Sequence, residues 1–201
     1  MRLIPSILLL VAFVLLRETV GAQTPVAKPM DVRPVALETA LTGRWVGVLE
    51  YRDYSEPAGS TKRVQLPTWL EIQPAPEGMR LVYTYDDGIY PNGTAKILEE
   101  RDVVVFDTAS KIYRAMENGK PWESYAVAGL DALKDGRGEL VLTGPGTENN
   151  KPAEMRTTWT IRRNLLTILE ETRPAGTQEG FAFRHRYVFT RAEIPKAAAA
   201  R

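Results

Sequence analysis

Residues 35–51 read VALETALTGRWVGVLEY, and a change of pattern within this stretch decides the fold. The first part, 35–41, spaces its apolar residues as a short helix does, and Gly43 follows at the point where helices commonly end. From Gly43 onward apolar and polar residues alternate with a period of two, which is typical of a half-buried β-strand. The stretch therefore predicts one short helix that leads directly into the first strand.

The alternating pattern continues along the chain in short runs that are separated by turn-forming residues. Such separators include Asp86-Asp87-Gly88, Gly144-Pro145-Gly146 and Asn149-Asn150. Strands are expected at 44–51, 67–73, 79–86, 95–100, 102–107, 111–116, 124–130, 139–143, 154–163, 165–172 and 181–191. This arrangement predicts an all-β fold, an antiparallel up-and-down β-barrel of about 8–10 strands with a short N-terminal helix, because closure removes exposed strand edges.

The alternation also predicts which side chains share the inner face of the barrel. In the last strand, the phase that contains the aromatic residues from Phe181 to Phe189 is expected inside, and the phase of Arg184 and Arg186 outside. The same reasoning predicts a largely apolar, aromatic interior with some hydroxyl groups and one imidazole. The residues predicted to line a ligand site are Tyr83, Tyr85, Trp159, His185 and Tyr187.

The N-terminal segment has the order of a secretory signal. Arg2 precedes an almost wholly apolar run, and small residues at Val20 and Ala22 favour cleavage before Gln23. The apolar run is shorter than the roughly 20 residues of a membrane span. The expected organisation is a signal peptide (1–22), a flexible leader (23–34), the barrel domain (35–193) and a flexible tail (194–201). The sequence thus predicts a periplasmic or secreted protein with no stable membrane anchor after cleavage.

Charge and cysteine content restrict the partners. Cleavage would remove Arg2, Arg17 and Glu18 from a chain with 26 basic and 25 acidic residues, which leaves no net charge. A nucleic-acid partner is not expected, because such binding needs an excess of Lys and Arg. The chain has no cysteine, so an extracytoplasmic domain of this size must be stabilised by its core alone.

Few residues suit the common catalytic and metal chemistries. His185 is the only histidine and the chain has no cysteine, so it lacks the ligands of a zinc site and the pair of a Cys-His apparatus. A Ser-His-Asp apparatus is not expected either, because no Gly-x-Ser-x-Gly elbow occurs. Adjacent carboxylates such as Glu99-Glu100 point to opposite faces of a strand, and a dyad built from two strands has no sequence signature. We expect no catalytic residue, metal or cofactor, and a haem ligand role for His185 is disfavoured because no haem attachment sequence accompanies it.

Leu41-Thr42-Gly43-Arg44-Trp45 resembles the Gly-x-Trp signature that opens the first strand of lipocalins and related calycin barrels after a short helical turn. The resemblance implies that Gly43 and Trp45 are structural residues. It also implies that the tryptophan closes one end of the barrel and packs against an arginine near the last strand, which is Arg184, Arg186 or Arg191. A cup that binds a small hydrophobic molecule is the function that the resemblance implies.

Three functional hypotheses follow from the sequence. The first is an exported, lipocalin-like protein that binds a small hydrophobic ligand. We favour this binding function over an enzymatic one. The second is a barrel enzyme, such as an isomerase or cyclase, in which His185 transfers a proton because its unperturbed pKa lies near neutrality. The third is an envelope-interaction module with a solid core. A cavity with polar groups pointing into it would distinguish the third hypothesis from the other two.

Overall fold

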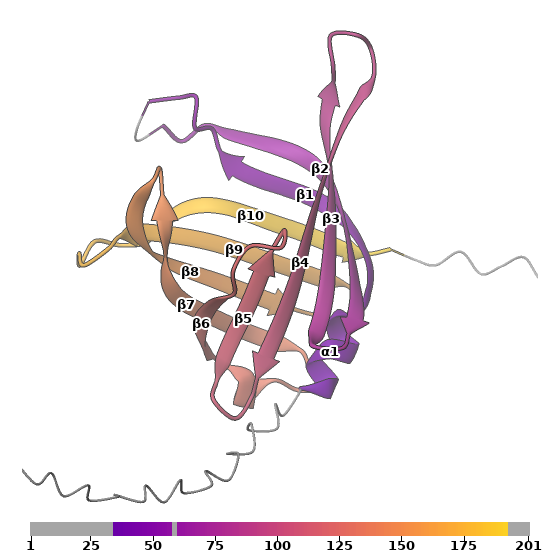
Figure 1. The fold of residues 1–201 in the computed structure, drawn as a ribbon, viewed down its shortest axis with the longest axis vertical. Helices are drawn as coiled ribbons and strands as arrows, with labels where there is room; N and C mark the ends of the chain where they lie inside the picture. Colours follow the sequence, from indigo (N-terminus) through magenta and orange to yellow (C-terminus); the bar gives the residue numbers. More distant parts are fainter. Residues whose placement is uncertain (1–33, 58–59, 193–201) are drawn as a thin grey trace, which may run out of the picture. The chain divides into compact units, whose positions relative to one another are not determined.

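The computed structural model describes residues 34–57 and 60–192, which form a closed barrel of antiparallel strands (Figure 1). The expected signal peptide and tail, and all of the expected leader except Pro34, lie outside the described residues. The elements in chain order are α1 (Val35–Leu41), β1 (Gly43–Arg52), β2 (Arg63–Ala75), β3 (Gly78–Ile89), β4 (Ala95–Asp107), β5 (Ile112–Glu117), β6 (Glu123–Ala128), a 3₁₀ turn (Leu130–Ala132), β7 (Gly138–Glu148), β8 (Lys151–Ile161), β9 (Leu165–Pro174) and β10 (Ala182–Arg191).

Each strand pairs with its neighbours in sequence, and β1 pairs with β10 to close the barrel. The closing register runs from Trp45 opposite Arg191 to Tyr51 opposite His185. The expected fold, an all-β up-and-down barrel of antiparallel strands after one short helix, is confirmed. The helix has the expected bounds, and Asn149 and Asn150 both take positive φ in the two-residue turn between β7 and β8.

Some expected strand boundaries are wrong. Residues 95–100 and 102–107 form one continuous strand, β4, because both halves pair with β3 in a single long hairpin. Asp86-Asp87-Gly88 is a bulge inside β3, since the register with β4 shifts between Asp86 and Ile89. Gly144-Pro145-Gly146 continues β7, whose partner there is β8. Residues that favour turns are tolerated in these strands where the ladder remains paired on one side.

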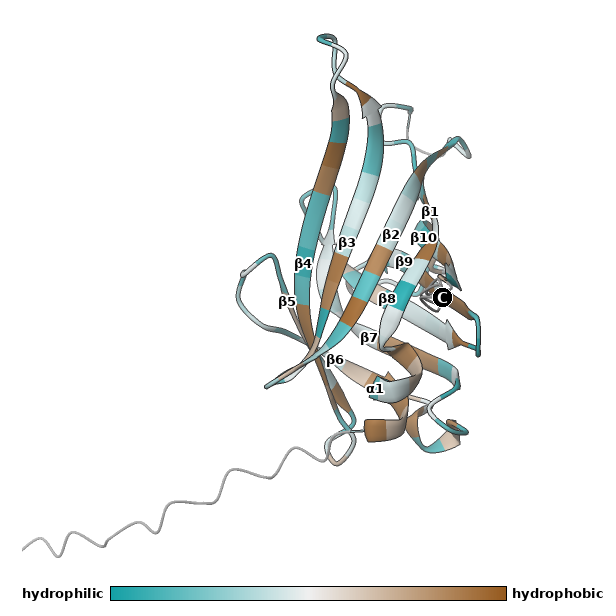
Figure 2. Ribbon diagram, turned by 90° about the vertical axis from the view of Figure 1, so that its right-hand side faces the viewer, coloured by the Kyte–Doolittle hydropathy of each residue, from teal (hydrophilic) through white to brown (hydrophobic). Residues whose placement is uncertain are grey.

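Helix α1 fills the end of the barrel from which β1 starts. It buries Leu37, Ala40 and Leu41 in the same apolar cluster as Trp45 and Phe189. At this end the inward residues of every strand are apolar or aromatic and almost fully buried. Figure 2 shows the β4 ribbon changing from hydrophobic near the end that α1 covers to hydrophilic in the middle of the strand, before a second hydrophobic stretch toward the β3–β4 hairpin. The barrel is therefore solid at the helix end and polar beyond it.

Trp45 and Arg191 hold the helix on this end. The Arg191 guanidinium lies 4.1 Å above the Trp45 ring and donates to the carbonyl oxygens of Ala40 (2.5 Å) and Thr42 (2.8 Å). The Trp45 Nε1 donates to the Leu41 oxygen at 2.9 Å. These donors satisfy carbonyls that a helix terminus leaves without intrahelical partners. Of the three arginines left open by the sequence, Arg191 is the one that packs on Trp45.

Gly43 is required by the same arrangement. Its φ of +134° is rare for residues with a side chain, and a Cβ at this position would lie 2.7 Å from Arg191 Nη1. A side chain at position 43 would therefore displace the guanidinium from the helix carbonyls. The structural role expected for Gly43 agrees with this geometry.

We expect Gly136→Ala to lower the free energy of unfolding by about 1 kcal/mol more than Gly93→Ala. Both glycines have positive φ, +71° and +82°, so both variants carry the same backbone penalty. Only at Gly136 would the new Cβ overlap helix α1, 2.0 Å from the Ala36 oxygen, whereas at Gly93 nothing lies within 4 Å. Urea denaturation followed by circular dichroism measures the difference. Equal losses would contradict close packing of the helix on this turn.

Candidate functional site

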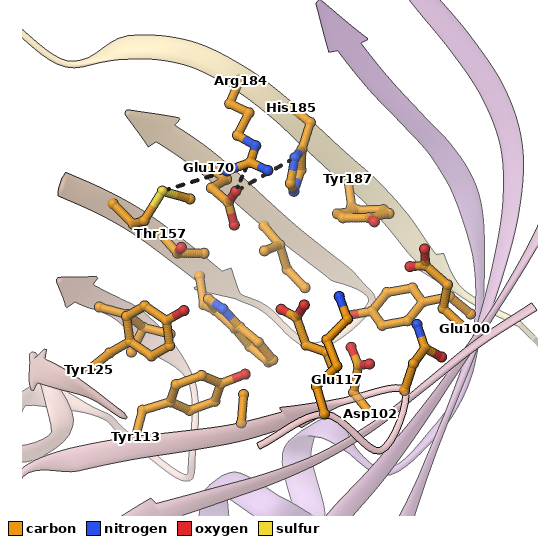
Figure 3. Close-up of a pocket in the computed structure, with 18 residues that line it drawn as sticks. Glu100, Asp102, Tyr113, Glu117, Tyr125, Thr157, Glu170, Arg184, His185 and Tyr187 are labelled. Atoms are coloured by element: carbon orange, nitrogen blue, oxygen red, sulfur yellow. Dashed lines mark hydrogen bonds and ion pairs between the residues drawn. The ribbon is translucent and has the colours of Figure 1, made fainter. Parts of the chain in front are cut away.

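A cavity of about 230 Å³ lies inside the barrel beyond the apolar end (Figure 3). It adjoins an outer hollow of about 670 Å³, and Glu100, Arg184, His185 and Tyr187 line both. We call the first the inner cavity and the second the vestibule. The residues that line the inner cavity are Tyr83, Glu100, Asp102, Tyr113, Ala115, Glu117, Asn118, Lys120, Tyr125, Leu142, Met155, Thr157, Trp159, Ile168, Glu170, Arg184, His185 and Tyr187.

The structure places all five predicted ligand-site residues around these two spaces. Tyr83, Trp159, His185 and Tyr187 line the inner cavity, and Tyr85 lines the vestibule. The rings of Tyr83 and Tyr187 are 5.3 Å apart between centroids, and those of Tyr83 and Tyr85 are stacked at 6.2 Å. These contacts follow from the alternation within β3 and β10, which points the three tyrosines inward.

Three residues near the start of β10 do not follow the expected phase. The register between β10 and β9 shifts between Phe183 and His185, and this bulge turns Arg184 inward. Arg184, expected outside, lines the inner cavity, with its Nε 3.3 Å from Glu170. Phe181 and Phe183, expected inside, do not line either space. They pack against arginines instead, and Phe183 lies 4.4 Å from the Arg63 guanidinium.

The interior is more acidic than the sequence reasoning predicted. Four carboxylates line the inner cavity, and Lys120 and Arg184 are the cations that line it. Asp102 on β4 lies directly opposite Glu117 on β5 in the strand register, and Glu170 on β9 lies opposite His185 on β10. The alternation within β4 and β5 indicates that Asp102 and Glu117 point inward. Asp102 is in phase with the buried Val104 and Phe106, and Glu117 is in phase with the buried Tyr113 and Ala115.

Burial raises the pKa of Asp102, Glu117 and Glu170, and neighbouring carboxylates add to the effect. Burial raises the pKa of Asp102 to about 7, and the charges of Glu117 and Glu100 add to this effect. Burial also raises the pKa of Glu117 and Glu170, the second against the opposing effect of Arg184. A carboxyl that titrates near neutrality marks a place where negative charge is not fully compensated.

Tyrosine hydroxyls lie next to these carboxylates, since Tyr83 on β3 pairs with Glu100 on β4. Tyr85 donates to Glu100 at 2.9 Å, and because it has a single proton it accepts from Tyr187, also at 2.9 Å. This chain holds Glu100 as an oriented acceptor at the junction of the inner cavity and the vestibule. The pKa of Tyr187 is raised by burial, so its hydroxyl stays protonated as the donor of the chain.

Tyr83 and Tyr113 have hydroxyls with no hydrogen-bond partner among the described residues. The two residues are only 6% and 8% exposed, so little bulk water reaches them. In Figure 3 the Tyr113 hydroxyl points toward the middle of the cavity, on the side of Glu117. No buried side-chain oxygen among the described residues lacks a hydrogen-bond partner, so these two hydroxyls are open to the cavity, where a bound molecule can be their partner.

His185 is poorly suited to proton transfer near neutral pH. Burial lowers its pKa to about 4, and the adjacent Arg184 charge acts in the same direction. Its Nδ1 lies 3.8 Å from Glu170, which is beyond hydrogen-bond distance. The imidazole is therefore neutral at pH 7 and contributes a polar, uncharged edge to the cavity wall.

No group of three or more His, Asp or Glu residues in residues 34–57 and 60–192 is arranged to hold a metal ion. Within the same part of the chain, no helix has the length and apolar character needed to cross a membrane.

Comparison with known proteins yields no match. No protein-family model matches the chain, and no curated protein matches it. The likeness to lipocalins thus depends on the residues of this chain, namely Gly43, Trp45 and the fold they open.

Proposed function

We propose that the protein is an exported, lipocalin-like binding protein that takes a small molecule with an apolar body into the inner cavity. The observation that carries this proposal is a closed barrel with one end sealed by α1 and a cavity of about 230 Å³ behind a wider vestibule. Barrels of this size class can hold one small ligand. Leu142, Ile168 and Trp159 supply apolar wall for the body of the ligand.

The other two hypotheses have less support. A solid-core module needs no cavity with unpartnered hydroxyls, whereas Tyr83 and Tyr113 face such a cavity. A barrel enzyme that uses His185 as its base needs an imidazole that titrates near neutrality, and the pKa of His185 is lowered to about 4. A binding protein without catalytic activity is compatible with both the cavity and the lowered pKa of His185.

Trp159 gives a direct test of the proposal, because it lines the inner cavity while Trp122 is exposed outside it. We expect at least one compound from a panel of fatty acids, haem, polyaromatic compounds and alkylammonium ions to quench tryptophan fluorescence saturably. Trp159→Phe should remove most of this quenching, and Trp122→Phe should leave it intact. Absence of quenching across the panel, or quenching that depends on Trp122 alone, would contradict binding in the barrel.

A further inference from the structure

The inner cavity has a chemical asymmetry that restricts the charge of its ligand. On one side Arg184 is shared between Glu170 (3.3 Å) and Glu148 (3.6 Å), so the negative charge there is largely compensated. On the other side lie Asp102, which is half-buried, and Glu100 and Glu117, which are exposed. The cation whose charge acts on Asp102 and Glu117 is Lys120, an exposed residue on the turn after β5. An excess of negative charge therefore remains beside β4 and β5.

The unpartnered hydroxyls lie next to this excess charge. Tyr113 is influenced by the charges of Asp102 and Glu117, and Tyr83 by those of Asp102 and Glu100. Figure 3 shows the Asp102 and Glu117 carboxylates near one another, with the Tyr113 hydroxyl on the same side of the cavity. Carboxylate oxygens only accept hydrogen bonds when ionised, and a tyrosine oxygen can accept as well. The region thus offers several acceptors to a single group with several donors.

We infer that the ligand carries an ammonium group, and that this group binds between Asp102, Glu117 and the hydroxyls of Tyr83 and Tyr113. The inference rests on the proposed function and names the chemical class of its ligand. A primary or secondary ammonium has two or three N–H donors, which matches the clustered acceptors, and aromatic rings favour a nearby cation. The apolar body then lies toward Leu142, Ile168 and Trp159.

Binding of an ammonium should be linked to deprotonation of the site. The charged and titratable groups that face Asp102 are Glu100 on its own strand, Glu117 on β5, Lys120 on the following turn, and the hydroxyls of Tyr83 and Tyr113. Because the pKa of Asp102 is about 7, its carboxyl is mostly protonated at pH 6 and mostly ionised at pH 8. Only the ionised form attracts a cation, so affinity should increase across this range.

Isothermal titration calorimetry with three probes of similar size tests the inference: phenethylammonium, phenethyl alcohol and phenylacetate. At pH 8 we expect phenethylammonium to bind at least about tenfold more tightly than the alcohol, and phenylacetate to bind most weakly. The affinity for phenethylammonium should fall several-fold from pH 8 to pH 6, whereas that for the uncharged alcohol should change little.

Substitutions of Asp102 and Glu117 test whether these two carboxylates cause the preference for phenethylammonium. Asp102→Asn and Glu117→Gln should each weaken phenethylammonium binding by about tenfold while changing alcohol binding less than about twofold. Glu139→Gln, which alters an exposed carboxylate on the outer face of β7, is the control and should change neither. Circular dichroism of each variant establishes that it is folded.

The outcomes separate this inference from the proposed function. Equal binding of alcohol and ammonium, or tighter binding of phenylacetate, would overturn the ammonium site and leave a binding barrel intact. Wild-type affinity of Asp102→Asn for phenethylammonium would also overturn it. If none of the three probes binds the wild-type protein, the ammonium site is wrong, and the proposed function falls only if the wider panel also fails to quench Trp159.

Discussion

Trp45→Ala is expected to lower the free energy of unfolding by about 3–5 kcal/mol, the usual cost of removing a large aromatic side chain from a core. Trp45 is 1% exposed and contacts both the helix and the end of the barrel. Its loss would create a cavity beneath Arg191 and remove the cation–π contact of that guanidinium. Urea denaturation followed by far-ultraviolet circular dichroism measures the loss.

Trp69→Ala is the matched control for this prediction. Trp69 is the outward neighbour of Val46 in the β1–β2 register and is 45% exposed, so its removal should cost no more than about 1 kcal/mol. A cost for Trp45→Ala that is no greater than that for Trp69→Ala would contradict the role of Trp45 in sealing the barrel.

Asp102→Asn is expected to stabilise the protein at pH 8 by about 2 kcal/mol. The folded state raises the pKa of Asp102 from 3.8 to about 7, so it favours the protonated carboxyl. Stability from this group is fully present below the unfolded pKa and is lost as pH rises through the folded pKa. A shift of about three pKa units corresponds to about 4 kcal/mol, and we expect about half because solvent in the cavity screens the charge.

The pH dependence distinguishes this effect from a general improvement in packing. The stabilisation by Asp102→Asn should be less than half as large at pH 5, where the wild-type carboxyl is protonated in the folded state. Glu139→Gln, on the exposed outer face of β7, should change stability little at either pH. A stabilisation that is equal at pH 5 and pH 8, or a destabilisation at pH 8, would contradict the environment described for Asp102.

Such a result would also have a functional meaning. The inward residues at the helix end of the barrel are apolar. An inward carboxyl that weakens the fold at neutral pH is therefore an exception to core packing. Exceptions of this kind are characteristic of functional sites, where stability is lost for the sake of binding. Asp102 should therefore be the position at which stability and ligand affinity change in opposite directions.

The sequence predicted the architecture because local patterns determine it. The helix bounds, the inward phase of Tyr83, Tyr85 and Tyr187, and the Asn149-Asn150 turn all follow from alternation and turn chemistry within a few residues. Antiparallel neighbours with short links leave few alternative topologies. The sequence did not decide which of three arginines packs on Trp45, because that contact depends on the register of β1 with β10 and not on a local pattern.

The character of the site was harder to predict, for two physical reasons. A single bulge reverses the faces of the residues on one side of it. No residue near Phe183 indicates the bulge that turns Arg184 inward. The acidic excess arises when carboxylates of β4, β5 and β9 meet in space. Each carboxylate taken alone resembles an ordinary polar residue at the open end of a strand, so only the assembled barrel shows that Asp102 and Glu117 face one another.

The central claim, that a small molecule with an ammonium group binds inside the barrel, is tested most directly by nuclear magnetic resonance of the protein with ¹³C-labelled tyrosine rings. Titration with phenethylammonium at pH 8 should shift the signals of Tyr83 and Tyr113 saturably and leave Tyr90, at the exposed tip of the β3–β4 hairpin, unchanged. Tyrosine-to-phenylalanine variants assign the signals. Shifts confined to exposed tyrosines such as Tyr90, or no shift at Tyr83 and Tyr113, would contradict the claim.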